Sequence, residues 1–390
     1  MRCGYVIIET VKIVALKETA TGENRLALTP QSIARLVRLG AAVAVERGYG
    51  ESLRLKDAEF ESAGAELGER TPLLSEADML LWVQPPGAAD IAAIKPGAVV
   101  AGFLDPFFRP DLVRALAQGG VEALCMELIP RSTYAQKMDA LSSQASLAGY
   151  AAVISATERI DKAFPMMSTP AGTIAPARVF VVGAGVAGLQ AIATAKRLGA
   201  RVEAYDTRPV VKEQVMSLGA RFVEIDVGET GQTAQGYAKA LTEEQLAMQR
   251  EQMAKVCAGA DVVVTTAQVF GRKAPLIISA AMVAGMRPGS VIVDLAAATG
   301  GNVEGTVADQ VVETANGVTI IGLSNAPAAV ARDASQVYSN NLYLLIEHAW
   351  DAEARTLKLD KADEVVGAAL LTSGGVIRDE RVRSVVEGAG

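Results

Sequence analysis

The stretch from 178 to 190 constrains the fold more than any other part of the chain, because it combines a strand, a glycine turn and a helix. A β-branched run enters the pattern Gly183-Ala-Gly185-Val-Ala-Gly188, and an alanine-rich run leaves it and stops at Gly199. Gly185 lets the backbone approach a phosphate, and Gly188 lets the helix pack closely on the strand. The amides at the helix N-terminus then face the phosphates. This order predicts a turn that binds the pyrophosphate of a dinucleotide.

An acidic residue follows where such a domain contacts the adenosine ribose. Residues 201–206 read as a second strand, and its last residue, Asp206, follows Gly188 at roughly the usual spacing of 20 residues. A carboxylate there bonds the ribose hydroxyls and repels a 2′-phosphate, so we expect NAD(H) rather than NADP(H). Arg208 is the opposing signal, because a nearby arginine can accept that phosphate. The cofactor contacts predicted in this domain are Gly183, Gly185, Val186, Gly188, Asp206, Thr207, Arg208 and Ala267.

Composition narrows the class of protein further. The 390 residues allow two or three domains with a large core, and 50% apolar with 21% charged residues is normal for an α/β protein. A net charge of −7 without a basic block argues against a nucleic-acid partner. The three cysteines are widely spaced, which indicates a reducing compartment and no metal site. No apolar run reaches about 18 residues, so no membrane-spanning helix is predicted.

Strands and helices alternate along the first third of the chain, which is the rhythm of a parallel sheet. Thr29 and Pro30 mark the start of the first helix, and Gly40 marks its end. We expect strands at 11–16, 41–46, 79–83, 98–103 and 121–128, and helices at 30–39, 57–65 and 110–118.

Two long helical stretches, 143–160 and 333–350, bracket the domain of the glycine turn. That domain continues through strands at 262–266, 290–295 and 318–322. We therefore predict an α/β fold of two Rossmann-like, doubly wound parallel-sheet domains joined by two long helices. The first domain comprises residues 11–142 plus 335–390, and the NAD(H)-binding domain comprises 143–334.

Several motifs resemble the alanine dehydrogenase/transhydrogenase family, which includes the NAD(H)-binding component of proton-translocating nicotinamide nucleotide transhydrogenase. They are Lys12-Ile-Val-Ala-Leu-Lys-Glu18, Asn24-Arg-Leu-Ala-Leu-Thr-Pro30 and Gly183–Gln190. The stretch from Met126 to Gln144 is similar to the transhydrogenase component in particular. The resemblance covers nearly all of residues 11–390.

Departures from the dehydrogenase pattern separate the two branches. Alanine dehydrogenases use an arginine, a lysine, a histidine and an aspartate around their substrate. Arg25 matches the arginine, which we expect to survive as a structural ion-pair partner. The other positions fall on Gln84, Phe103 and Ala298, whose side chains cannot relay a proton. Hydride exchange between two nicotinamide rings needs no such relay, only close positioning and exclusion of water.

The resemblance implies that a loop after Pro130 lies beside the nicotinamide. Its implied functional residues are Arg131, Gln136 and Asp139. Arg131 and Asp139 would pair and order the loop, and Gln136 would bridge the NAD(H) ribose and the partner's nucleotide. Ser142 would bond the nicotinamide amide. From the residues alone, a solvated turn with a surface ion pair stays open as the alternative.

The resemblance also implies a mobile loop at 226–239 that closes over NAD(H), with Tyr237 as its anchor. The glycine-rich, polar sequence fits this role, although an ordinary surface loop remains open. His348 has no base network near it in the sequence, so we interpret it as a structural helix residue.

Taken together, the resemblance implies an NAD(H)-binding subunit of a proton-translocating transhydrogenase. It would form a homodimer and exchange a hydride between NADH and NADP⁺, with NADP(H) on a partner component. The proton channel would lie on membrane-spanning partner subunits, and the chain would be cytoplasmic and peripheral at the inner face of the plasma membrane. The alternatives are an active alanine dehydrogenase and a non-catalytic NADH-binding module.

Overall fold

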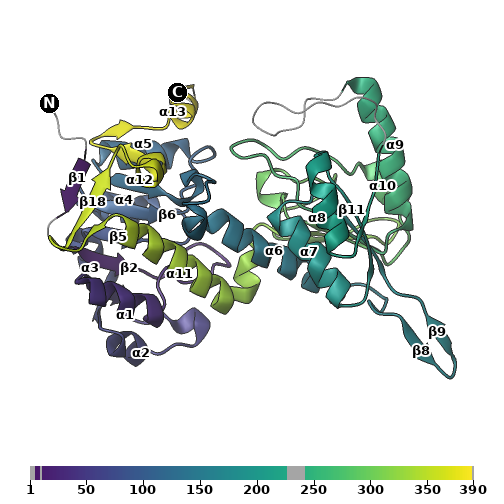
Figure 1. The fold of residues 1–390 in the computed structure, drawn as a ribbon, viewed down its shortest axis with the longest axis horizontal. Helices are drawn as coiled ribbons and strands as arrows, with labels where there is room; N and C mark the ends of the chain where they lie inside the picture. The colour runs from purple at the N-terminus through teal and green to yellow at the C-terminus, as the bar shows by residue number, and fades with distance from the viewer. Residues whose placement is uncertain (1–4, 9–10, 226–241, 389–390) are drawn as a thin grey trace. The chain divides into compact units, whose positions relative to one another are not determined.

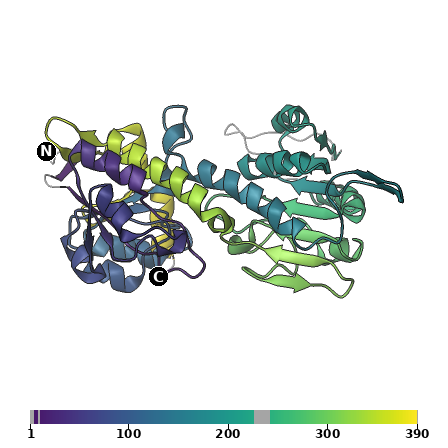
Figure 2. The ribbon, with the colours of Figure 1, turned by 90° about the horizontal axis from the view of Figure 1, so that it is seen from below.

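The computed structural model describes residues 5–8, 11–225 and 242–388. The chain divides into two compact units, of which unit 1 comprises Met1–Gln144 with Ala328–Gly390 and unit 2 comprises Ala145–Pro327. Each unit contains its own sheet, and each is described by itself below (Figures 1 and 2). The predicted α/β fold with parallel-sheet domains is confirmed.

Unit 1 is built on an eight-stranded sheet in the order β20-β19-β7-β6-β5-β2-β3-β4. Its strands are β2 (Lys12–Ala15), β3 (Ala42–Glu46), β4 (Ala65–Gly68), β5 (Met79–Leu81), β6 (Val99–Gly102), β7 (Glu122–Cys125), β19 (Leu370–Ser373) and β20 (Val376–Ile377). The strands β2 to β7 pair in parallel, whereas β19 runs antiparallel to β7 at the edge. The central strands read as unbroken apolar runs because helices cover both faces.

Alternate residues of β2 enter two separate cores, one on each face of this sheet. Ile13 packs in the core that contains α1 (Pro30–Leu39) and α11 (Ala331–His348), and Val14 packs in the opposite core. The other helices of unit 1 are α2 (Asp57–Ser62), α3 (Arg70–Glu76), α4 (Ala88–Ala93), α5 (Pro110–Gln118), α12 (Glu364–Ala369) and α13 (Glu380–Gly388). Short 3₁₀ turns are η1 (Glu51–Leu53), η2 (Met126–Leu128) and η3 (Gln136–Met138). A small antiparallel sheet joins β1 (Tyr5–Ile8), β18 (Thr356–Asp360) and β17 (Trp350–Asp351).

Local signals at the first helix act as predicted. The Thr29 side chain accepts a hydrogen bond from the Ser32 amide, Pro30 is the first helical residue, and Gly40 closes the helix at φ 99°. The predicted helix at 57–65 is wrong in its last residues. Gly64 adopts φ 97°, a left-handed conformation that ends α2, and Ala65 then begins β4.

Unit 2 contains a seven-stranded sheet in the order β12-β11-β10-β13-β14-β16-β15. Its strands are β10 (Arg178–Val182), β11 (Arg201–Tyr205), β12 (Arg221–Phe222), β13 (Val262–Thr265), β14 (Val291–Asp294), β15 (Val311–Glu313) and β16 (Thr319–Gly322). All pair in parallel except β15, which runs antiparallel to β16. The six parallel strands have the Rossmann order, whose direction of winding switches between β10 and β13.

Helices cover both faces of this sheet as well. They are α7 (Val186–Arg197), α8 (Lys212–Ser217), α9 (Glu243–Gly259) and α10 (Ala280–Ala284), with 3₁₀ turns η4 (Pro209–Val211), η5 (Ala297–Thr299) and η6 (Ala326–Val330). The long helix α6 (Ala140–Thr157) crosses the boundary between the units, whereas α11 begins after it. A hairpin of β8 (Met167–Thr169) and β9 (Gly172–Ile174) extends from unit 2 with every residue exposed (Figure 1). No pattern in the sequence predicts this hairpin.

Candidate functional site

The glycine turn of unit 2 joins β10 to α7 at the carboxyl edge of the sheet. A Cβ added at Gly188 would lie 1.8 Å from the carbonyl oxygen of Gly183, so only glycine permits this approach. A Cβ added at Gly185 would meet no atom within 4 Å, which leaves the backbone on that side open. Val186 begins α7 and is exposed. The turn therefore has the close packing and the open amide face that a pyrophosphate requires.

Asp206 lies against this turn, directly after β11. Its Oδ2 accepts a hydrogen bond from the Ala184 amide at 2.7 Å, and its Oδ1 accepts one from the Arg208 amide at 2.8 Å. The Arg208 guanidinium also donates to both oxygens, each at 3.0 Å. Burial alone would raise the pKa of Asp206, but the Arg208 side chain and these amides hold that pKa below its usual value. Asp206 is thus an ionised carboxylate at the place where we predicted the ribose contact, and Thr207 beside it is exposed.

The two residues that the sequence set in opposition are therefore partners. Arg208 forms an ion pair with Asp206, so much of its charge is compensated before any nucleotide arrives. The physical consequence is a site edge whose net charge does not favour a 2′-phosphate.

A buried polar network supports the third strand end of the site. The Ala267 amide donates to Asn302 Oδ1 at 3.0 Å, and Asn302 Nδ2 donates back to the Ala267 carbonyl at 2.8 Å. The amide of Asn302 donates to Asp294 Oδ2 at 2.8 Å, and both side chains are fully buried. The residues predicted from the sequence did not include this pair, although an aspartate at the end of an apolar strand was a signal for it. Ala267 also lies next to Gly183, so the ends of β10, β11 and β13 meet at one site.

The loop at 131–139, here called the contact loop, belongs to unit 1. Arg131 and Gln136 are exposed, whereas Asp139 is buried. The predicted pairing of Arg131 with Asp139 is wrong, because no ion pair joins them among the described residues. Asp139 instead caps α6, accepting hydrogen bonds from the Ser142 amide at 2.9 Å and from the Ser142 hydroxyl at 2.6 Å. Free amides at a helix N-terminus attract a carboxylate more strongly than a distant exposed guanidinium does.

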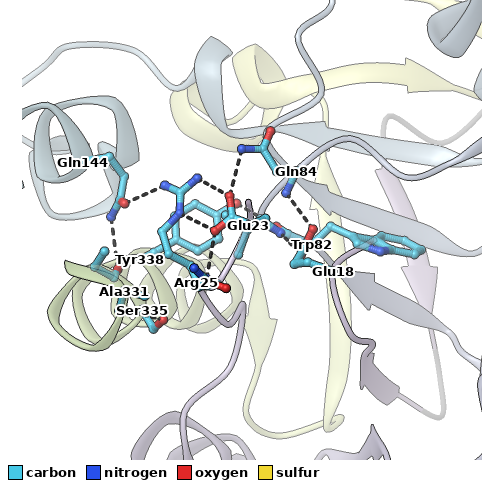
Figure 3. A network of polar contacts seen from close by, with 12 residues as sticks. Glu18, Glu23, Arg25, Trp82, Gln84, Gln144, Ala331, Ser335 and Tyr338 are labelled. Atoms are coloured by element: carbon cyan, nitrogen blue, oxygen red, sulfur yellow. Dashed lines mark hydrogen bonds and ion pairs between the residues drawn. The ribbon is translucent and has the colours of Figure 1, made fainter. Parts of the chain in front are cut away.

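Unit 1 contains a second polar cluster, centred on Arg25 (Figure 3). Glu23 receives hydrogen bonds from Arg25 Nε at 2.8 Å and from Arg25 Nη2 at 2.6 Å, which makes a bidentate ion pair. Arg25 Nη1 donates to Gln144 Oε1 at 2.8 Å, and Gln84 Nε2 donates to Glu23 Oε2 at 2.9 Å. Burial would raise the pKa of Glu23, but Arg25 lowers it below the usual value. The predicted structural ion pair of Arg25 is confirmed.

Helix α11 holds the segment that carries this cluster. Its Ser335 hydroxyl accepts a hydrogen bond from the Leu26 amide at 2.8 Å, and its Tyr338 hydroxyl donates to the Trp82 carbonyl at 2.8 Å (Figure 3). Phe103 packs against the Tyr338 ring at a centroid distance of 5.1 Å. Its position therefore presents an apolar ring, with no group that can transfer a proton.

Glu18 is a buried carboxyl group that the sequence patterns did not single out. It follows β2 and accepts hydrogen bonds from the amides of Val83 at 2.6 Å and Gln84 at 3.2 Å. Burial raises its pKa to about 8, and the negative charge of Glu23 adds to that shift. Its role depends on residues more than 60 positions away, so no local pattern could have revealed it.

Two other predicted residues remain to be placed. Ala298 lies exposed in η5 and offers only a methyl group. Tyr237 and the loop around it lie outside the described residues. Among the helices of the described ranges, none combines the length and the apolar character that a bilayer crossing needs.

A Rossmann-ordered sheet with a glycine turn and an acidic residue after its second strand defines a dinucleotide-binding protein of the oxidoreductase class. Two family models match the chain, "Alanine dehydrogenase/PNT, N-terminal domain" over residues 14–148 and "Alanine dehydrogenase/PNT, C-terminal domain" over residues 152–380. The chain belongs to the alanine dehydrogenase/PNT family.

Within that family the transhydrogenase branch is the more similar one. The chain is 43% identical to an NAD(P) transhydrogenase alpha subunit of Rickettsia prowazekii, over 97% of this chain and 98% of that protein. It is 29% identical to alanine dehydrogenase of Mycobacterium tuberculosis, over 94% of each. A solved transhydrogenase structure from Sinorhizobium meliloti superposes with a TM-score of 0.84 at 44% identity, covering 94% of this chain and 99% of that one. The predicted resemblance to the transhydrogenase alpha subunit, and with it the assignment to the oxidoreductases, is confirmed.

Proposed function

We propose that this chain binds NAD(H) and exchanges a hydride with NADP(H) that a separate component holds. The observation that carries the proposal is the contrast between the two polar sites. Unit 2 has a glycine turn with an ionised Asp206 beside it, whereas the cluster of unit 1 has its arginine already engaged by Glu23. A chain with a cofactor site and no available acid–base site for a small substrate fits transfer between two nucleotides.

The residues of the glycine turn fit NAD(H). The space beside Gly185 would admit the pyrophosphate, the first amides of α7 would donate to it, and Asp206 would accept from the adenosine ribose. When bound, the nicotinamide supplies the hydride. The chain's own residues then have to orient the nucleotide and exclude water, because no substrate proton is removed.

We assign the contact loop to the side of the nucleotide that meets the partner. Gln136 is exposed at the start of η3, so it can reach a group outside the chain. Ser142 would bond the nicotinamide amide, although its hydroxyl donates to Asp139 in this structure. Arg131 is exposed and would meet an anionic group of the partner's nucleotide rather than Asp139. Tyr237 would anchor a loop that closes over NAD(H).

The further partners are inferred from the same relatives. Coupling to proton movement would require membrane-spanning subunits, and the chain would then be peripheral at the cytoplasmic face of the plasma membrane. We also propose a homodimer. The exposed β8–β9 hairpin and the residue before it present Met166, Met167 and Ile174 at 63%, 42% and 40% exposure, and an isolated hairpin is marginal without a surface to pack on. Sedimentation of the purified chain tests this, with a monomer as the contrary result.

An active alanine dehydrogenase is disfavoured by the cluster around Arg25. Its guanidinium already binds the carboxylate of Glu23, and Gln84, Phe103 and Ala298 carry no acid or base. The 29% identity to an alanine dehydrogenase keeps that activity worth measuring. A mixing experiment tests the proposal: hydride exchange from NADH to NADP⁺ should occur when an NADP(H)-binding component is added and not with the chain alone.

A further inference from the structure

The chain's single histidine joins two side chains from distant parts of unit 1. His348 is the last residue of α11, and its Nε2 lies 3.0 Å from Asp363 Oδ1. Its Nδ1 lies 3.2 Å from the hydroxyl of Tyr134, which belongs to the contact loop. The Tyr134 and His348 rings meet edge to face, with centroids 5.5 Å apart and an interplanar angle of 74°. The three residues form a continuous relay from α12 to the loop.

Asp363 fixes the orientation of the imidazole. It caps α12 by accepting hydrogen bonds from the amides of Val365 at 2.9 Å and Val366 at 2.8 Å. Burial alone would raise the pKa of Asp363, but the Val366 amide, His348 and the Val365 amide lower it below the usual value. An ionised Asp363 requires a proton on Nε2, so in the neutral imidazole Nδ1 is the acceptor and the Tyr134 hydroxyl donates.

The contact loop is anchored firmly only at its base. Ala135 and Met138 are fully buried in the core below α11, and Asn341 Nδ2 donates to the Lys137 carbonyl at 2.9 Å. Tyr134 is 57% exposed, and among the described residues no other hydrogen bond reaches its hydroxyl. The contact with His348 is therefore what restrains the outer side of the loop.

We propose that His348 and Tyr134 are positioning residues, which hold the contact loop at the geometry that hydride transfer needs. This inference rests on the proposed function, because it takes the contact loop to meet the partner's nucleotide. Neither side chain touches the reacting atoms. Their effect passes through the loop backbone to Gln136, where a displacement of about 1 Å can cost on the order of a hundredfold in rate.

Three substitutions separate the two hydrogen bonds of the imidazole. Tyr134→Phe keeps the ring and removes the hydroxyl. His348→Gln places an amide nitrogen near the Nε2 position, so it keeps a donor for Asp363 and loses the acceptor for Tyr134. His348→Asn places an amide group near the Nδ1 position, so it keeps a partner for Tyr134 and loses the bond to Asp363. Tyr150→Phe is the matched control, because Tyr150 is 39% exposed and no hydrogen bond of its hydroxyl occurs in the described ranges.

Limited trypsin digestion measures the loop without any hydride transfer. The bond after Arg131 lies in the exposed part of the loop, so cleavage there reports loop opening. We expect Tyr134→Phe and His348→Gln to be cleaved several-fold faster than the unmodified chain, and His348→Asn and Tyr150→Phe to be cleaved at its rate. Urea unfolding of each variant distinguishes loop opening from a loss of global stability. Equal cleavage of all variants would overturn the proposal.

Single-turnover transfer with the NADP(H)-binding component measures the consequence. Tyr134→Phe and His348→Gln should each slow transfer about tenfold, within the range that small misplacements cause, and leave the NADH dissociation constant unchanged. Because both remove one hydrogen bond, the double variant should be no slower than either single variant. Faster cleavage with unchanged transfer would refute the positioning role. Absence of transfer in the unmodified chain would refute the proposed function, while digestion would still decide whether His348 restrains the loop.

Discussion

At the scale of single residues, charge at the edge of the glycine turn decides which nucleotide can bind. Asp206 is ionised and is already bonded to the Ala184 amide and to Arg208. A nucleotide ribose has to share these acceptor atoms. Nucleotide selectivity therefore depends on one carboxylate, with Arg208 held in a compensated state by its partner.

The first prediction concerns Asp206→Asn. The change removes the charged acceptor and frees Arg208 from its ion pair, so NADH binding should weaken and the preference over NADPH should narrow. The loss of one charged hydrogen bond, about 1.5–3 kcal/mol, corresponds to roughly 10- to 150-fold in the NADH dissociation constant. Equilibrium titration with both reduced nucleotides measures the change.

The chain provides a control with the same local geometry. Asp379 accepts hydrogen bonds from the amide of Arg381 at 2.9 Å and from its guanidinium, but it lies in unit 1. Asp379→Asn removes the same charge and should leave the preference for NADH unchanged. Equal affinity of the unmodified chain for NADH and NADPH would contradict the role of Asp206.

A second prediction at this scale concerns Glu18 and pH. Its pKa is raised from 4.5 to about 8 in the folded chain, so between these values the folded state binds more protons than the unfolded state. The contribution of Glu18 to stability therefore falls as pH rises through this window and levels off above it. Urea unfolding at several pH values should show a steeper loss for the unmodified chain than for Glu18→Gln. Parallel curves would show that Glu18 titrates normally.

At the scale of elements, the strand–turn–helix unit of unit 2 depends on two glycines for different reasons. A Cβ at Gly188 would overlap the Gly183 carbonyl, whereas a Cβ at Gly185 would face open space. One glycine is needed by the fold, and the other by the nucleotide.

Alanine substitutions should separate these roles. Gly188→Ala should destabilise unit 2, because its Cβ would lie 1.8 Å from a backbone oxygen that cannot move independently. Gly185→Ala should leave thermal unfolding without nucleotide nearly unchanged and weaken NADH binding. Thermal unfolding with and without NADH measures both. Retention of full NADH affinity by Gly185→Ala would mean that the pyrophosphate lies elsewhere.

The contact loop carries the next prediction. Gln136→Asn keeps the amide but withdraws it by one methylene, roughly 1.5 Å, so hydride transfer should slow far more than NADH binding weakens. Stopped-flow single turnovers with the NADP(H)-binding component, compared with a binding titration of the chain alone, measure the two effects. A parallel loss of rate and affinity would make Gln136 an ordinary NADH contact.

Signals within one element were sufficient to predict much of the fold, and contacts between elements were not. Thr29, Pro30 and Gly40 act through neighbours in sequence, so the bounds of α1 followed from them. The hairpin at 167–174 has no buried face and hence no alternating pattern. The pairing of Arg131 with Asp139 failed because the amides of α6 take the carboxylate. The relay from Asp363 to Tyr134 joins residues more than 200 positions apart and has no local signature.

At the scale of the whole molecule, the chain combines one site built for a nucleotide with one whose charges are satisfied internally. In unit 1, Arg25 and Glu23 neutralise each other inside a cluster that Gln84 and Gln144 complete. In unit 2, the glycine turn remains open at Gly185. A molecule arranged in this way needs a second nucleotide from outside to perform chemistry.

The most direct test is a comparison of two reactions of the same purified chain. One assay measures hydride transfer from NADH to NADP⁺ with an added NADP(H)-binding component, and the other measures NAD⁺ reduction by L-alanine at alkaline pH. We predict transfer that requires both components and no reduction by alanine. Alanine-dependent turnover in the ordinary enzymatic range, about 1–1000 per second, without transfer between nucleotides would contradict the proposed function.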